Sequence, residues 1–149
     1  GSIVWVESGY TMRSTLPPRE KSPFHIWFSK DEIADRSINF TRYDIWPEEA
    51  SDTSYIPYGE FKVSNVSVER EDGLYVTGDV ENIGSLTSTA HIVVSVYDEG
   101  GKLVGCGSNF NPELEHGQTW SFEIWGPAPP GTIDKWVIYV EGTPSEISG

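Results

Sequence analysis

Few residues in this chain of 149 have the types and spacing that catalysis or metal binding would need. The candidate zinc ligands are three histidines, His25, His91 and His116, and the single cysteine, Cys106. No two of them have the close spacing of a structural zinc site. A serine hydrolase needs a G-x-S-x-G elbow or a comparable context, and the sequence has none. The sequence therefore predicts no cofactor, no metal and no catalytic residue.

Two acidic stretches could supply oxygen ligands for calcium. They read SKDEIAD at 29–35 and WPEEASD at 46–52. Neither has the alternating ligand positions and the central glycine of an EF-hand loop. We expect both stretches to be solvated charge.

The aromatic residues are a better indication of function. Alternation along the segment TWSFEIW (119–125) places Phe122 and Ile124 on one face of a strand, and Glu123 and Trp125 on the other. An outward tryptophan can cover a loop, contact another protein or stack on a sugar ring, and the sequence leaves these alternatives open.

The same pattern occurs near the beginning of the chain. In PFHIW (23–27), Phe24 and Ile26 fall on the inward side, and His25 and Trp27 fall on the outward side, where we expect His25 to be exposed. We therefore predict an interaction surface among Trp27, Trp125, His25 and Glu123.

This similarity is part of a longer repeat. LPPREKSPFHIW (16–27) aligns without a gap with LEHGQTWSFEIW (114–125), at an offset of 98 residues. We interpret residues 3–43 as the truncated back half of a duplicated domain and residues 60–143 as the complete copy. The acidic segment 44–59, with two prolines, is predicted to be a linker.

Short strands separated by turn signals fill the complete copy. Outside it, residues 29–37 are the one candidate for a helical turn, with Ser29 as its cap. The expected strands are 60–70, 74–82, 89–98, 102–110, 119–125 and 134–142. The first breaks strict alternation, which predicts a bulge, and Asp98 is predicted to bond backbone amides in the turn at 98–101. This pattern predicts an all-β, antiparallel β-sandwich with an additional N-terminal half-repeat of β-strands.

The segments VTGDVENIG and IVVSVYDEGGKLVG resemble the FxLYD family of β-sandwich domains, over about 80 residues. The resemblance lies in Gly78-x-Val80-x-Asn82 and in Val94-x-Val96-Tyr97-Asp98 before a glycine hairpin. Val94 and Val96 replace the Phe and Leu of the family name, and in the truncated copy Arg19 stands where the complete copy has Gly117. The resemblance implies an Ig or fibronectin III-like sandwich of prokaryotic exported proteins, and it implies no catalytic residues.

Charge and composition narrow the classes of partner. The net charge is −13, which disfavours nucleic acid and anionic membrane surfaces. No run of 18 apolar residues exists, and the sequons at Asn39 and Asn65 indicate a surface location. The resemblance implies a secreted or cell-envelope location. Because the chain starts Gly1-Ser2, we expect any signal or anchor to lie outside it. The expected function is a non-enzymatic spacer, scaffold or protein-binding module; the alternatives are a carbohydrate-binding module and, less favoured, an enzyme.

The half-repeat should expose an apolar face made of Phe24, Ile26, Ile38 and Phe40. Half a sandwich is marginal in water, so this face needs cover. It can pack on the complete domain of the same chain, or two copies can pair across a twofold axis as a homodimer. The commoner use of isologous contacts favours the homodimer.

Overall fold

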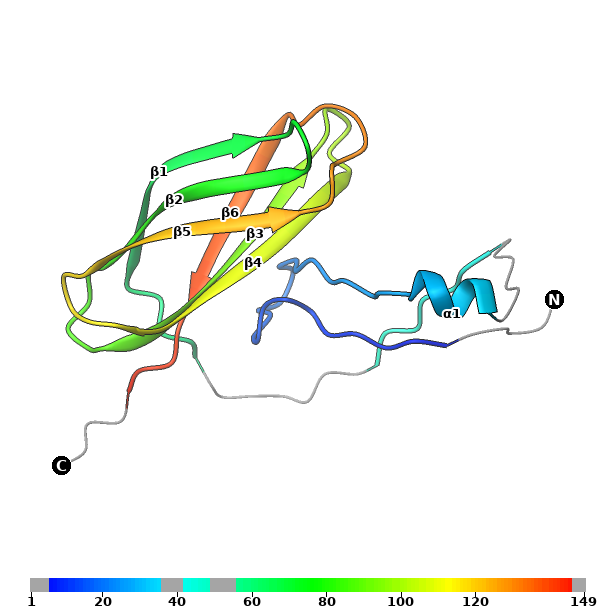
Figure 1. Cartoon of the computed structure of the whole chain (residues 1–149). Coiled ribbons are helices and arrows are strands. Elements are labelled where there is room, and N and C mark those ends of the chain that lie inside the picture. The colour runs from blue at the N-terminus through cyan, green and yellow to red at the C-terminus, as the bar shows by residue number, and fades with distance from the viewer. Residues whose placement is uncertain (1–5, 36–41, 49–55, 146–149) are drawn as a thin grey trace.

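A computed structural model describes residues 6–35, 42–48 and 56–145 of the chain (Figure 1). Its elements are one short helix and six strands: α1 (Lys30–Asp35), β1 (Phe61–Glu69), β2 (Leu74–Asn82), β3 (Ser88–Tyr97), β4 (Leu103–Leu114), β5 (Thr119–Gly126) and β6 (Lys135–Glu141). The six strands fall within the predicted complete copy, and each overlaps one of the expected strands.

The strands form two antiparallel three-stranded sheets, with the orders β1-β2-β5 and β4-β3-β6. The two sheets face each other as the layers of a sandwich (Figure 1). Both the β2–β3 and the β4–β5 connections cross from one sheet to the other. The predicted all-β, antiparallel sandwich is therefore confirmed.

The core lies between the sheets and follows from period-2 alternation. Every second residue of β2 is buried, from Leu74 to Asn82. Phe122 and Ile124 of β5 are each 1% exposed, as their inward assignment predicted. A Cβ atom at Gly78 would lie 2.8 Å from the Phe122 ring, so only glycine leaves room for that ring.

A buried amide fixes the end of β2 to the end of β4. The side chain of Asn82 is 0% exposed, and its Nδ2 donates to the carbonyl oxygens of Leu86 and Leu114. Its Oδ1 accepts from Tyr58 Oη and from the Gly84 amide. With all its hydrogen-bonding capacity used, this buried polar group stabilises one arrangement of the chain.

Local features of the sandwich agree with their sequence signals. The β1–β2 register shifts between Ser64 and Ser67, which is the predicted bulge, and Asn65 there has a φ of 53°. In the hairpin turn, Asp98 Oδ1 accepts from the Lys102 amide at 2.9 Å, as predicted. The short helix α1 lies at the predicted site, and the Ile33 amide donates to the Ser29 carbonyl.

The expected N-terminal half-repeat of strands is not what residues 6–35 form. Their β structure is one isolated bridge between Thr11 and Phe24, beside a hydrogen bond from the Met12 amide to the Pro23 carbonyl. We call residues 6–28 the arm. Its tip, residues 13–20, lies against the β4-β3-β6 sheet, and its two legs, residues 6–12 and 21–28, extend from there (Figure 1). Ile38 and Phe40 lie outside the described residues.

Candidate functional site

The two outer faces of the sandwich differ, because the arm covers only one of them. The other, on the β1-β2-β5 sheet, carries Tyr75, Asp79, Ser121, Glu123 and Trp125, and we call it the open face.

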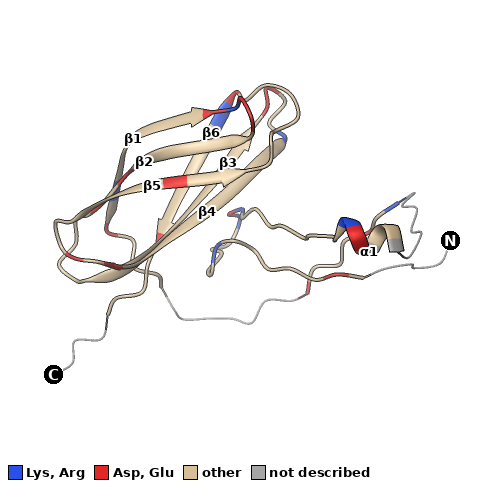
Figure 2. Cartoon of the chain, viewed as in Figure 1, with Lys and Arg blue, Asp and Glu red and all other residues tan. Residues whose placement is uncertain are grey.

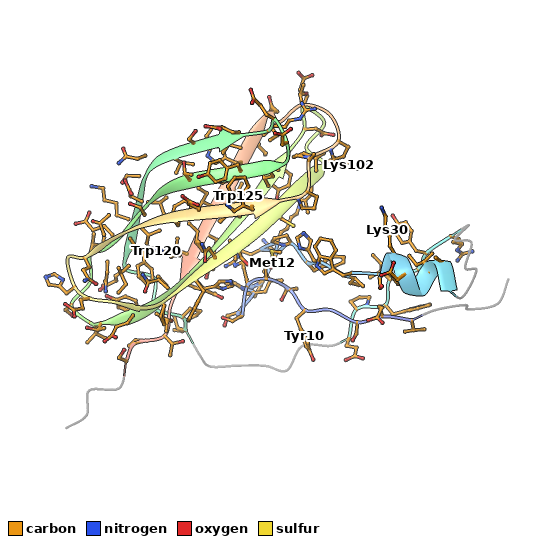
Figure 3. The ribbon with its side chains drawn as sticks, in the orientation of Figure 1. Tyr10, Met12, Lys30, Lys102, Trp120 and Trp125 are labelled. Carbon is orange, nitrogen blue, oxygen red and sulfur yellow. The ribbon has the colours of Figure 1, made fainter. Side chains whose placement is uncertain are left out.

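Tyr75 and Trp125 form the aromatic part of the open face. They are cross-strand partners of β2 and β5, and their ring centroids are 3.9 Å apart with planes inclined by 28°. Trp125 is 70% exposed, and it projects from β5 in Figure 3. Its predicted outward direction is confirmed, and so is that of Glu123, which is exposed.

Hydrogen bonds order the polar part of the same face. Asp79 Oδ2 accepts from Asn65 Nδ2 and its Oδ1 accepts from Ser121 Oγ, both at 2.7 Å. These two bonds lower the pKa of Asp79 below its ordinary value. Partial desolvation, followed by the charge and hydrogen bond of Glu123, raises the pKa of the Tyr75 phenol.

The opposite face, on β4-β3-β6, is covered by the tip of the arm. The Arg13 guanidinium lies 3.5 Å from the centre of the Tyr139 ring, which is a cation–π contact. The Ser14 amide and hydroxyl both donate to Glu141 Oε1 at 2.7 Å. These contacts attach residues 13–14 to β6.

The expected exposure of His25 is wrong. His25 is half-buried, because its Nε2 lies 2.9 Å from the Sγ of Cys106, which is only 4% exposed. Burial raises the pKa of the Cys106 thiol. Trp27 packs edge-on to His25 at 5.4 Å and is itself 70% exposed, as predicted. Trp27 and His25 therefore belong to the arm, whereas Trp125 and Glu123 belong to the open face.

The fold brings His25 and Cys106 together although 81 residues separate them, a proximity that sequence spacing did not reveal. Within the described ranges, no group of three or more His, Cys, Asp or Glu side chains is placed to hold a metal ion. His116 lies in a turn, as predicted, with its Nδ1 close to the Gly84 carbonyl. Part of the acidic stretch 46–52 lies outside the described residues.

A hollow of about 370 Å³ beside the arm brings together Ser14, His91 and Glu141, which sequence reasoning did not group. The Ser14 hydroxyl donates to Glu141, and His91 Nδ1 is 3.7 Å from the same carboxylate oxygen. In a serine hydrolase the imidazole accepts the serine proton and the carboxylate orients the imidazole. The order here is different, so these three residues do not form such a triad.

Acidic side chains are distributed over the sandwich and the extended segments (Figure 2). No helix in the described part of the chain has the length and apolar character needed to cross a membrane.

The comparisons with known proteins add no relative. No protein-family model matches this chain, and neither a curated protein nor a solved structure matches it significantly. The fold and site define the class as an all-β sandwich with an arm packed on one sheet. The FxLYD resemblance stays a prediction.

Proposed function

We propose that this chain is a non-enzymatic binding module of a secreted or cell-envelope protein, and that it contacts a protein partner through the open face. The observation that carries the proposal is the Tyr75–Trp125 stack, because Trp125 stays 70% exposed while its ring is held in place. A large ring with little freedom left to lose is the kind of group that dominates interface energies.

The polar side chains around the stack support the same function. Asp79 and Ser121 are already ordered by hydrogen bonds, so little side-chain entropy is lost when a partner binds. An apolar centre with a polar rim is the usual anatomy of an interface. With a chain charge of −13, the favoured partner is one whose contacting surface is basic.

The non-enzymatic part of the proposal rests on chemistry. Of the titratable groups with a shifted pKa, Asp79 is held by Asn65 and Ser121, and Cys106 is covered by His25. Neither arrangement leaves an activated nucleophile or base facing a substrate. The exported location rests on the FxLYD resemblance.

A carbohydrate partner is the second candidate, and one observation favours it. The carboxylates of Asp79 and Glu123 lie on the same face as the exposed Trp125 ring. Stacking on a ring combined with hydrogen bonds to carboxylates suits the apolar faces and the hydroxyl groups of a sugar.

The test compares two tryptophans of equal exposure, Trp125 and Trp27, each 70% exposed. The wild-type chain, Trp125→Ala and Trp27→Ala are used to capture partners from envelope and secreted fractions of the source cells. Each captured protein is identified, purified and titrated against all three chains. We expect binding at least tenfold weaker for Trp125→Ala and unchanged for Trp27→Ala.

Equal binding by Trp125→Ala and wild type would overturn the assignment of the open face. A parallel titration with purified oligosaccharides, followed by Trp fluorescence, tests the second candidate. If sugars bind with the same dependence on Trp125, and enzymatic deglycosylation of the captured partner abolishes its binding, the carbohydrate function replaces the protein-binding one.

A further inference from the structure

The turn in the arm repeats the geometry of the turn between β4 and β5. Arg19 has a φ of 70°, and Gly117, 98 residues later, has a φ of 74°. In the arm the Glu20 amide donates to the Pro17 carbonyl at 3.1 Å. In the sandwich the Gln118 amide donates to the Glu115 carbonyl at 3.0 Å. A positive φ is uncommon for arginine, so the arm adopts this turn without the residue that would make it easiest.

The crossing of the two legs is repeated as well. A Cβ atom at Gly107 would lie 2.4 Å from the Ile124 side chain, where β4 passes close to β5. The corresponding Cβ at Gly9 would lie 2.6 Å from the His25 carbonyl oxygen and 3.1 Å from the Ile26 side chain. The arm thus shares its turn and the close approach of its legs with the β4–β5 unit, although its legs are joined to each other by one bridge whereas β4 and β5 lie in different sheets.

The arm differs from the β4–β5 unit in what covers its apolar side. Leu114 and Phe122 are 2% and 1% exposed, whereas Leu16 and Phe24 at the matching positions are both 44% exposed. In the sandwich, β3 pairs with β4 and β2 pairs with β5. The His25 side of the arm contacts the sandwich; alternation puts its neighbour Phe24, which is 44% exposed, on the opposite side, and we call this the uncovered side.

The topology of the sandwich indicates what fits on this uncovered side. β2–β3 and β4–β5 are both pairs of strands that cross between sheets, and each strand of one pair lies antiparallel to a strand of the other. A second β4–β5 unit, turned by a twofold axis, can therefore occupy the place of β2–β3. We propose that two copies of this chain associate through their arms, each arm supplying the pair of strands that the other lacks.

In this arrangement the leg 21–28 of one copy lies antiparallel to the leg 6–12 of the other, and the twofold axis generates the same contact again. Phe24 and Leu16 of both copies then face a shared core. Charge permits the association, because residues 6–28 contain three basic and two acidic side chains in a chain of net charge −13.

Sedimentation velocity on the full chain tests the association. We expect a dimer at micromolar concentration, strengthened when salt rises and screens the overall negative charge. Phe24→Asp should be monomeric with the melting temperature of the sandwich unchanged, and Trp125→Asp should stay dimeric. A wild-type monomer up to high micromolar concentration would overturn the proposal, as would dimers that persist in Phe24→Asp or weaken with added salt.

The strand pairing has its own readout. Isotope-filtered nuclear Overhauser spectra of a dimer mixed from labelled and unlabelled chains should show contacts between residues 6–12 of one copy and 21–28 of the other. Intermolecular contacts confined to other residues would overturn the pairing. The two proposals fail separately, because Trp125→Asp abolishes partner capture through the open face and leaves arm pairing intact.

Discussion

Residues 16–27 and 114–125 match in register at Leu, Phe, Ile and Trp and share the geometry of their turn, and still they differ in strand pairing. The later segment contains most of β5, paired along its length with β2. The earlier one contributes a single bridge, through Phe24. The tryptophans that end the two segments are equally exposed, at 70%, so the difference lies on the side that should face a core.

The comparison shows that a strand is made by its neighbours as much as by its own residues. β propensity reflects packing on a half-buried, pleated surface, and two isolated strands are marginal in water. The segment 119–125 has β2 at its edge and the opposite sheet beneath it. The segment 21–28 has no strand paired along its length, and the sheet beneath it contacts its His25 side, so its alternation places side chains on two sides without forming a ladder.

The largest expected difference between the two segments is in the free energy of unfolding lost when the equivalent phenylalanines, Phe122 and Phe24, are replaced by alanine. Phe122→Ala should destabilise the sandwich by about 3–5 kcal/mol, because the ring is 1% exposed in a packed core. Phe24→Ala should cost less than about 1 kcal/mol, because that ring is 44% exposed and lies outside the core. Urea denaturation at sub-micromolar concentration measures both. Equal losses would mean that the arm belongs to the cooperative core.

Sequence periodicity predicted the sandwich because its strands cover one another, so burial obeys the alternation that the residues encode. It placed the outward side chains of Trp125 and Glu123 for the same reason. It failed for His25, since contact with Cys106 depends on how the arm lies against β4, and no local pattern encodes that contact. The Tyr75–Trp125 pair needed the register of β2 on β5, which a single strand does not specify.

Thiol labelling sharpens the comparison at the place where the arm meets the sheet. In the native chain Cys106 should react slowly with a disulfide reagent, because it is buried and its raised pKa keeps it protonated at neutral pH. His25→Ala should speed labelling about tenfold or more by uncovering the sulfur. Labelling at the wild-type rate in His25→Ala would show that the arm does not cover β4.

The open face gives the smallest expected effect. Hydrogen bonds from Asn65 and Ser121 lower the pKa of Asp79 in the folded state. Ionised Asp79 therefore stabilises the fold at any pH above its unfolded-state pKa, and this stabilisation is lost as the pH falls through the folded-state pKa. Asn65→Ala should raise the pKa of Asp79 towards 3.8. Carbon-13 NMR titration of the Asp79 carboxyl measures the shift, and an unchanged value would contradict the hydrogen bond from Asn65.

Hydrogen exchange of the full chain at sub-micromolar concentration, read by mass spectrometry, tests most directly whether neighbouring strands decide the structure of the two similar segments. The amides of 119–126 that donate to β2 should exchange slowly, through global unfolding, whereas the alternate amides on the free edge of β5 should not. Amides of 21–28 should exchange at least a hundredfold faster, and they should gain protection only when the concentration is raised and the arms pair. Equal, strong protection of both segments in the monomer would contradict this account.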